Sequence, residues 1–342
     1  MSFEYIQEIP GFEEIIAEMP IDDELRAVKR ERDRRIADVL TGKSDRFLLI
    51  IGPCSAHHEG AVYEYVRRLA RVQEKVQDKL VIIPRVYTNK PRTTGQGYKG
   101  LLHQPDPAKK PDIVKGVKAL RTMHIRVIRE SGLTAADEML YPENYSYLAD
   151  LLSYVAIGAR SVENQQHRLT VSGLDVAAGM KNPTSGDISV MLNSVKAAQS
   201  PHVFGYHGWQ VQTSGNPLVH TVLRGATDSQ GKSIPNYHYE HLMNLAEVYL
   251  QSGLVNPAIL VDTNHSNSDK QYAQQPRIAR EVMGNRAYLP QLKRLVKGLM
   301  IESFLVEGAQ GEDGTVFGQS ITDPCLGWEE SERLILDIAD WV

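Results

Sequence analysis

The feature that most constrains the fold is a regular alternation of short apolar runs with stretches of helical character, which begins near residue 46. Intervening segments such as "EGAVYEYVRRLARVQEKV" repeat apolar residues with the 3.6-residue period of helices that pack on a sheet. Eight β/α units in 342 residues favour a TIM (β/α)8 barrel over a doubly wound α/β sheet, so we expect a barrel over residues 46–342. The eight expected strands are "RFLLIIGPCS", "KLVIIPRVY", "LTAADEML", "YVAIGAR", "DVAAGMKN", "HVFGY", "AILVDTNH" and "VKGLMIESFL".

Residues 1–45 do not follow this alternation, and we expect them to form an N-terminal extension, an arm followed by a helix, with contacts in an oligomer. After Pro20, Asp22 or Asp23 can cap a helix, because a short side-chain oxygen accepts from the free N–H groups of the first turn. Gly42 provides the stop.

Charge and composition restrict the ligand class and the compartment. A net charge of -4 argues against nucleic-acid binding, so an anionic ligand must be held by a local cluster of cations. No apolar run reaches the roughly 18 residues of a membrane span, and the start of the chain does not resemble a secretory signal. With only Cys54 and Cys325, free thiols in a reducing compartment are expected. These observations favour a cytoplasmic protein without membrane partners.

Reactive side chains follow the expected strands. In a TIM barrel the active site lies at the C-terminal ends of the strands, where the loops that follow them meet. The residues at or just beyond these ends are Cys54, Arg85, Lys90, Glu138, Arg160, Lys181, His265 and Glu302. We therefore expect them to converge on one site.

Six cations form the first candidate site: Arg85, Lys90, Arg92, Arg160, Lys181 and Arg224. Arginine supplies a planar fork that suits carboxylate or phosphate, and lysine supplies a point charge that can also move a proton. Each cation alone is equally compatible with a surface charge paired to a nearby acid. Together they suit a polyanionic ligand.

A second candidate site combines a thiol, an imidazole and two carboxylates: Cys54, His265, Glu302 and Asp323. Such a set suits a divalent transition ion better than Ca²⁺ or Mg²⁺, whose ligands are mainly oxygens. A local alternative is Cys54 with His57 and His58. Spacing does not choose between them, because the first four residues are far apart in the sequence.

The stretch "GQGYKG" satisfies the pattern G-x-G-x-x-G through Gly95, Gly97 and Gly100. A dinucleotide fingerprint needs these glycines in the tight turn between a strand and a helix. Here "TNKPRTT" intervenes and "HQPDPAKKP" breaks any helix soon afterwards. We expect a loop rather than a nucleotide site.

Ordered motifs over most of the chain, from about residue 45 to residue 330, resemble those of type I 3-deoxy-D-arabino-heptulosonate 7-phosphate (DAHP) synthases. They include "IGPCS", "RVYTNKPRTT", "AIGARSVENQQHR", "GMKNPTSG", "LRGA", "DTNHSNSDKQ", "MIESFLVEG" and "SITDPCLGW". The resemblance implies condensation of phosphoenolpyruvate with D-erythrose 4-phosphate, the first step of the shikimate pathway, in a homodimer or homotetramer. The alternatives are another phosphoenolpyruvate:aldose-phosphate synthase, which "KPRTT" and "SITDPCLGW" disfavour, and a non-catalytic regulatory barrel.

The resemblance also assigns roles to individual residues. It makes Cys54, His265, Glu302 and Asp323 ligands of a divalent metal, Mn²⁺ first and otherwise Fe²⁺, Co²⁺ or Zn²⁺. It places Arg160, Lys181 and Arg224 at the phosphate of phosphoenolpyruvate, Arg85 and Lys90 at its carboxylate, and Arg92 and Thr93 at the sugar phosphate. Lys90 is the preferred proton donor, and Glu138 with Lys181 is expected to position water.

Two departures from the family pattern affect the expected regulation and the loop beside the sugar phosphate. One additional residue lies between "KPRTT" and "KGL". The segment from "SPHVFGY" to "QTSGN" is several residues shorter than in feedback-regulated relatives, which predicts weak or absent inhibition by aromatic amino acids. A disulfide between Cys54 and Cys325 is a further hypothesis, and it would remove a metal ligand.

Overall fold

Eight parallel strands form a barrel in the computed structural model, which describes residues 2–92, 95–106 and 109–342. The sheet order is β2, β1, β12, β11, β8, β5, β4, β3, and a parallel bridge between Arg85 and Ala136 joins β2 to β3. Consecutive barrel strands are therefore neighbours, which confirms the predicted TIM barrel. The strands are β1 Phe47–Gly52, β2 Leu80–Pro84, β3 Ala136–Glu138, β4 Tyr154–Ile157, β5 Ala177–Lys181, β8 Val219–Leu223, β11 Ile259–Asp262 and β12 Val296–Glu302.

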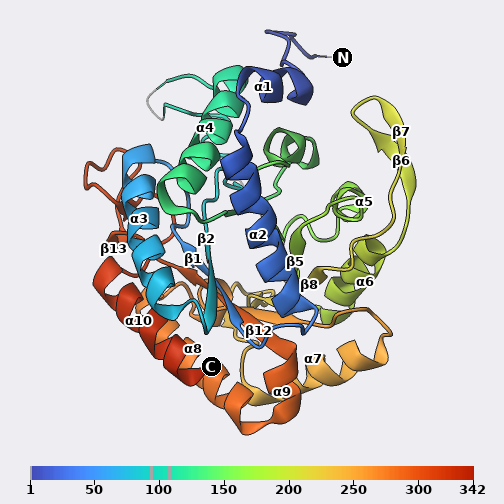
Figure 1. Cartoon of the computed structure of the whole chain (residues 1–342), viewed down its shortest axis with the longest axis vertical. Helices are drawn as coiled ribbons and strands as arrows, with labels where there is room; N and C mark the ends of the chain where they lie inside the picture. Colours follow the sequence, from blue (N-terminus) through green and yellow to red (C-terminus); the bar gives the residue numbers. More distant parts are fainter. Residues whose placement is uncertain (1, 93–94, 107–108) are drawn as a thin grey trace.

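Helices alternate with these strands and cover the outside of the barrel (Figure 1). They are α3 Glu59–Val76, α4 Ile113–Ser131, α5 Gln165–Val171, α6 Ile188–Gln199, α7 Tyr239–Gln251, α8 Gln275–Tyr288, α9 Pro290–Leu295 and α10 Trp328–Trp341. Short 3-10 helices are η1 Pro142–Leu148, η2 His265–Asn267 and η3 Tyr272–Gln274, and small paired strands are β9 Ala226–Thr227, β10 Ser233–Ile234, β13 Val306–Ala309 and β14 Gln319–Ser320. Among the described helices, none has both the length and the apolar character that crossing a bilayer requires.

The N-terminal extension contains α1 (Phe12–Glu18) and α2 (Asp23–Leu40). The helix after Pro20 begins as predicted, since the side chain of Asp22 accepts a hydrogen bond from the N–H of Leu25. The short helix α1 within the arm was not predicted.

The C-terminal end of α2 closes the end of the barrel at which the strands begin. Alternate residues of β1 point to opposite faces, and Leu48 and Ile50 belong to the interior cluster together with Ile36 and Leu40 of α2. Lys297, near the start of β12, donates to the carbonyl oxygens at the end of α2. The opposite end of the barrel is left to the loops that follow the strands.

The edge between β2 and β3 is completed by side chains, because β3 has only three residues. Gln73 of α3 accepts from the N–H of Ile82 at 2.7 Å and donates to the carbonyl of Leu80 at 3.0 Å. Arg32 of α2 donates to the carbonyl of Ile82. These three bonds satisfy strand groups that a longer β3 would otherwise pair.

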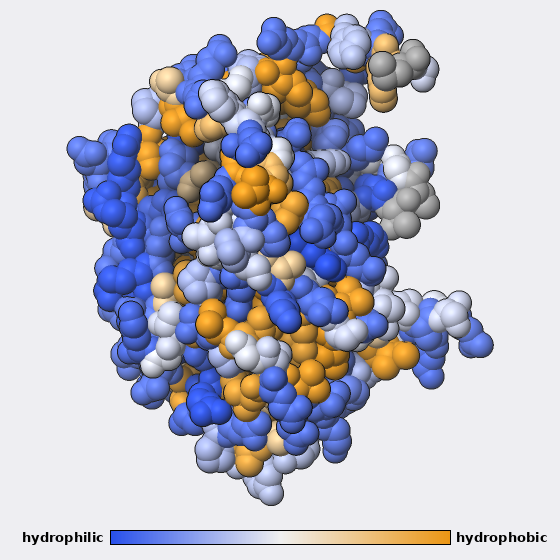
Figure 2. All heavy atoms as spheres, turned by 90° about the vertical axis from the view of Figure 1, so that its right-hand side faces the viewer, coloured by the Kyte–Doolittle hydropathy of each residue, from blue (hydrophilic) through white to orange (hydrophobic). Residues whose placement is uncertain are grey.

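The prediction of "HVFGY" as the sixth barrel strand was wrong. This segment forms β6 (Val203–Tyr206), which pairs antiparallel with β7 (Trp209–Gln212) in a hairpin that stands away from the barrel (Figure 1). Val203 is 60% exposed and Trp209 is 75% exposed. Figure 2 views the molecule from this side, where hydrophobic residues form scattered patches among hydrophilic ones. The sixth barrel strand is β8, which is fully buried. It was not recognised in the sequence because His220 and Thr221 are polar.

Candidate active site

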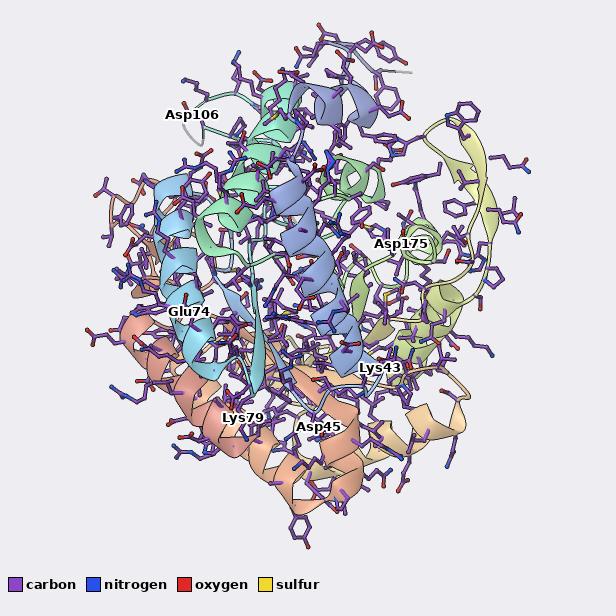
Figure 3. All side chains as sticks on the ribbon, in the orientation of Figure 1. Lys43, Asp45, Glu74, Lys79, Asp106 and Asp175 are labelled. Carbon is purple, nitrogen blue, oxygen red and sulfur yellow. The ribbon has the colours of Figure 1, made fainter. Side chains whose placement is uncertain are left out.

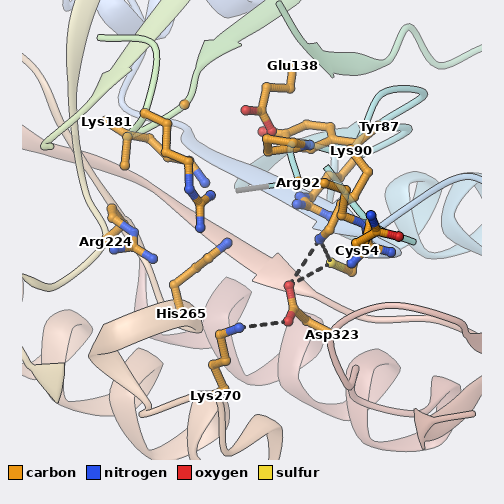
Figure 4. Close-up of a pocket in the computed structure, with 16 residues that line it drawn as sticks. Cys54, Tyr87, Lys90, Arg92, Glu138, Lys181, Arg224, His265, Lys270 and Asp323 are labelled. Atoms are coloured by element: carbon orange, nitrogen blue, oxygen red, sulfur yellow. Dashed lines mark hydrogen bonds and ion pairs between the residues drawn. The ribbon is translucent and has the colours of Figure 1, made fainter. Parts of the chain in front are cut away.

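A cavity of about 260 Å³ lies at the C-terminal ends of the barrel strands (Figure 4). It brings together ten of the predicted site residues: Cys54, Arg85, Lys90, Arg92, Glu138, Arg160, Lys181, Arg224, His265 and Asp323. Glu302 is buried, with 1% of its surface exposed, and contacts this group from within the barrel. Thr93 lies outside the described residues. Tyr87, Pro91, Gln96, Gly158, Ala159 and Lys270 complete the wall and were not predicted.

Three of the four predicted metal ligands form a tight cluster. One ligand atom each from Cys54, Glu302 and Asp323 lies within 4.8 Å of the others. His265 is outside this cluster, with its Nε2 4.0 Å from Glu302 Oε1. Its Nδ1 lies 2.9 Å from Asp262 Oδ2, so the carboxylate orients the ring and leaves Nε2 on the side of Glu302.

The donor set fits a divalent transition ion. Within the described residues, Glu302 Oε1 is buried and accepts no hydrogen bond, although Arg85 Nη2 lies 2.9 Å away. The other oxygen, Oε2, accepts from Asn264 Nδ2 at 2.5 Å, which fixes the orientation of the carboxylate. A buried oxygen without a hydrogen bond, beside a thiol and a second carboxylate, is an arrangement that a cation satisfies.

The alternative metal set is not assembled among the described residues. His58 Nδ1 accepts from the N–H of Ala61 and caps α3, and its ring lies 5.2 Å from that of Phe317. His57 packs its ring against Phe304. Both histidines therefore have structural contacts of their own.

The electrostatic environment shifts the pKa values of the Cys54 thiol and the Asp323 carboxylate in opposite directions. Burial, together with the charge of Glu302, raises the pKa of Cys54 to about 11. Burial alone would raise the pKa of Asp323, but the charges of Lys90 and Lys270 outweigh it, so that pKa lies well below its usual value. Asp323 is ionised at neutral pH, whereas the thiol must lose a proton when it binds a metal.

Lys90 contacts two of the ligand candidates. Its Nζ lies 2.6 Å from Cys54 Sγ and 3.0 Å from Asp323 Oδ2 (Figure 4). Burial lowers the pKa of Lys90, but the neighbouring negative groups more than offset this effect, and the pKa is raised. The lysine is therefore charged at neutral pH and lies in the wall of the cavity beside two of the predicted metal ligands.

The loop that carries Lys90 is held by Asp137, which sequence reasoning missed. The carboxylate of Asp137 accepts from the N–H of Thr88 at 2.9 Å and from its hydroxyl group, and it lies 3.3 Å from His124 Nε2. Gly100 allows the loop to close, because a Cβ there would lie 2.5 Å from the carbonyl oxygen of Thr88 and φ is +98°.

Arg85 is fixed on three sides. Its guanidinium stacks on the ring of Tyr87 at 3.7 Å, pairs with Glu302 at 2.9 Å and donates to the carbonyl of Pro53. Although burial disfavours the charge, the carboxylate of Glu302 outweighs it and raises the pKa of Arg85. Tyr87 could have been found as the aromatic residue two positions further along in "RVY", on the same face of the extended chain.

On the other side of the cavity lie Lys181 and Arg224 (Figure 4). Burial and the charge of nearby Arg160 lower the pKa of Arg224, whereas Asp262 partly opposes them. Asn182 Oδ1 accepts from the N–H of Arg224 at 2.9 Å and so ties the loop after β5 to the loop after β8. An anion between these cations would relieve their mutual repulsion.

Glu138 lies over Gly158, with no room between them for a side chain. A Cβ on Gly158 would lie 2.2 Å from Glu138 Oε1, so this glycine allows the carboxylate to reach the cavity. This glycine belongs to the sequence motif "IGAR", but its contact with Glu138 could not be predicted from that motif.

The rim carries two further cations. Arg92 donates from Nε to the carbonyl of Tyr98 at 2.8 Å and pairs with Glu312 at 3.3 Å. Lys270 Nζ lies 3.0 Å from Asp323 Oδ1. This lysine belongs to the motif "DTNHSNSDKQ", but sequence reasoning did not identify it as a site residue. The segment "GQGYKG" contributes Gln96 to the wall of the cavity, and residues 101–106 after it contain no helix.

Known proteins are similar to this chain over nearly its whole length. A "Phospho-2-dehydro-3-deoxyheptonate aldolase" of Haemophilus influenzae is 38% identical over 336 residues, which cover 96% of this chain and 90% of that protein. The "Phe-sensitive" protein of that name from Escherichia coli K12 is 40% identical over 318 residues, 90% of this chain and 87% of its own.

A solved structure of the same kind supports this relationship. The phospho-2-dehydro-3-deoxyheptonate aldolase from Francisella tularensis SCHU S4 superposes with a TM-score of 0.91 at 32% identity, covering 100% of this chain and 98% of that one. The profile of the DAHP synthetase I family matches residues 18–335. The chain therefore belongs to the DAHP synthetase I family.

Proposed function

We propose that this chain is a DAHP synthase that condenses phosphoenolpyruvate with D-erythrose 4-phosphate and water to give DAHP and phosphate, the entry to the shikimate pathway. The observation that carries the proposal is the convergence of seven cations and a thiol–carboxylate cluster on one cavity. Two phosphate esters and a carboxylate bring a charge of about -4 to -5 near neutral pH. The cations of the cavity match that load.

The two sides of the cavity suit the two substrates. Arg160, Lys181 and Arg224 are proposed to bind the phosphate of phosphoenolpyruvate, since all three line the cavity and the charge of Arg160 acts on Arg224. Arg85 and Lys90 would face its carboxylate, close to the metal cluster. At the rim, Arg92, with Thr93 beside it in the sequence, would bind the phosphate of the sugar.

A divalent ion, Mn²⁺ by preference and otherwise Fe²⁺, Co²⁺ or Zn²⁺, would be held by Cys54, His265, Glu302 and Asp323 and, when bound, would polarise the sugar aldehyde as a Lewis acid. Three of these four residues have a second contact that orients them. Asp262 orients His265, Asn264 orients Glu302, and Lys270 pairs with Asp323.

Side chains of the cavity are proposed to deliver a proton and to orient the water molecule in the reaction. C3 of phosphoenolpyruvate attacks the aldehyde carbon, water adds at C2, and cleavage of the carbon–oxygen bond releases phosphate. We propose that Lys90, which is charged and lines the cavity, delivers a proton to the oxygen of the former aldehyde. Glu138, which lines the same cavity as Lys181, is proposed to orient the attacking water together with that lysine.

The proposal is tested by a phosphate-release assay with both substrates, after replenishment with Mn²⁺ and in the presence or absence of a chelator. Turnover that requires the added ion is expected. Replacing the four-carbon sugar phosphate with a five-carbon one separates a DAHP synthase from the related synthases. No phosphate release with either sugar would favour a non-catalytic barrel.

A homodimer or homotetramer is proposed for the assembly. The arm is held to the barrel by a hydrogen bond of 2.7 Å from Tyr147 to the carbonyl of Pro10, yet Phe3, Tyr5 and Ile6 are 77%, 92% and 89% exposed. Apolar side chains this exposed are suited to contact with a second subunit. Analytical ultracentrifugation of the chain with and without residues 1–9 would test this assignment. An unchanged number of subunits would contradict it.

A further inference from the structure

A second cavity, of about 350 Å³, lies at the end of the barrel opposite the active site. Its wall includes Val39 and Gly42 after α2, Arg46 before β1, and Val296 at the start of β12. Asp45, another wall residue, is labelled below the lower end of α2 in Figure 3. Because the strands begin here, a ligand in this cavity is remote from the substrates of the proposed reaction.

The wall of this cavity is strongly basic. Five cations line it, with Asp45 as the single acidic side chain: Arg46, Arg286, Lys293, Arg294 and Lys297. Among the residues that the structure describes, none of the five has a carboxylate oxygen within the 4.0 Å of an ion pair. This concentration is unexpected in a chain with a net charge of -4. The cations repel one another, and an anion bound between them would offset this repulsion by attraction to each of them.

Two of the cations are built into the wall rather than scattered on the surface. Arg286 is only 5% exposed, donates from Nε to the carbonyl of Val296 at 3.1 Å, and lies over the ring of Phe47 at 5.1 Å. Lys297 donates to the carbonyls of Val39 and Leu40 at 3.0 and 2.7 Å. Their positions are therefore fixed before any ligand arrives.

Burial makes these charges costly. It lowers the pKa of Arg286, with partial relief from Asp45, and it lowers the pKa of Lys297, where the charge of Arg294 adds to the effect. A buried cation without a carboxylate partner is destabilising unless another anion satisfies it. Lys293 and Arg294 are exposed at the opening, where their side chains can move onto a ligand.

We propose that this cavity binds a small dianion, either inorganic phosphate or the phosphate group of a small monoester. Three guanidinium groups offer planar forks that match phosphate oxygens, and lysine adds a point charge. The volume falls in the range of small-molecule sites, which begins at roughly 300 Å³.

The test is calorimetric titration of the full chain with inorganic phosphate, in the presence of saturating phosphoenolpyruvate and with Arg92→Gln in every protein compared, so that the phosphate positions of the active site are occupied or removed. The protein with all five cations of this cavity is expected to bind phosphate at one site. Lys293→Gln with Arg294→Gln should weaken this binding at least about tenfold. Arg294→Lys should weaken it less than Arg294→Gln, because the charge is kept and only the fork is lost.

The matched control is Lys75→Gln with Arg333→Gln, which removes two cations whose side chains are 58% and 69% exposed on α3 and α10. This variant should bind phosphate like the protein with all five cations. Equal phosphate binding by the Lys293 and Arg294 variant, or none by the protein with all five cations, would overturn the proposal. The proposal would also be overturned if sodium chloride at the same ionic strength gave the same calorimetric signal as phosphate. A change in the oligomeric state of the Lys293 and Arg294 variant would contradict it too, because the cavity would then be an interface between copies.

Discussion

Lys181 Nζ donates a hydrogen bond of 2.8 Å to Asp262 Oδ2, and both side chains are buried. The same oxygen lies 2.9 Å from His265 Nδ1. Burial would raise the pKa of Asp262, but the charges of His265 and Lys181 outweigh it, so the carboxylate stays ionised with a pKa well below its usual value. One carboxylate thus links the proposed phosphate side of the cavity to the proposed metal side.

Asp262→Asn should impair both sides at once. The amide leaves Lys181 without its counter-charge and no longer orients His265, so metal affinity should fall about 10- to 100-fold. The KM for phosphoenolpyruvate should rise as well. Metal titration and steady-state kinetics measure the two effects separately, and Asp340→Asn on the exposed face of α10 is the control. An unchanged metal affinity together with an unchanged KM would contradict this role.

Gly158→Ala should reduce turnover without unfolding the barrel. The new Cβ would lie 2.2 Å from Glu138 Oε1, and the carboxylate at the end of that flexible side chain must move out of its position. We expect a decrease in kcat of at least about tenfold with a melting temperature near that of the wild type. Gly205→Ala is the matched control, since nothing lies within 4 Å of its Cβ position. Full activity of Gly158→Ala would show that Glu138 needs no fixed position.

Lys90→Met should abolish turnover while the fold is retained. Removing a positioned proton donor typically costs about 10²- to 10⁴-fold in rate. Phosphate release and a thermal melting curve are the two measurements, with Lys115→Met, whose side chain is 78% exposed on α4, as the control. Near-normal turnover with a cooperative melting curve would rule out this role.

Stability should fall between pH 6.5 and pH 4 because of His220. Burial lowers the pKa of this histidine from 6.5 to about 4, and its Nδ1 lies 2.9 Å from the carbonyl of Leu218 while Nε2 lies 2.8 Å from the Tyr154 hydroxyl. The unfolded chain binds this proton near pH 6.5 and the folded chain only near pH 4. Stability therefore rises with pH across this interval, and the loss at the acid end is roughly 3 kcal/mol.

Denaturant unfolding of wild type and His220→Gln at several pH values measures this contribution. The variant should lose less stability than the wild type between pH 6.5 and pH 4, because glutamine does not titrate there. Parallel pH dependence in the two proteins would show that His220 does not contribute.

Aromatic amino acids should inhibit this chain weakly or not at all, as the short "SPHVFGY" to "QTSGN" segment predicts. That segment still forms the β6–β7 hairpin, whose His207 ring lies 5.1 Å from that of Phe12 in the arm. Assays with Phe, Tyr and Trp in turn are the measurement. Strong inhibition by any of them would show that the shorter hairpin and the arm suffice for regulation.

Most of the barrel could be predicted because hydrophobic periodicity is a local property. Seven of the eight strands were placed correctly, and the exception is instructive. Val219–Leu223 is fully buried although His220 and Thr221 are polar, because His220 contacts Tyr154 and Thr221 donates to the carbonyl of Ala258. Such partners come from other strands, so a single strand's sequence cannot reveal that its polar residues are satisfied.

The sequence by itself determined the barrel and the residue types at the strand ends, since both follow from the order of apolar runs and the reactive residues after them. Only the tertiary structure decided which of these residues meet. Cys54 and Asp323 are 269 positions apart and lie 3.3 Å from each other, and Lys181 finds Asp262 across 81 positions. Barrel closure brings them together, and the contacts that orient them, from Asp137, Asp262 and the gap at Gly158, depend on packing that no local pattern encodes.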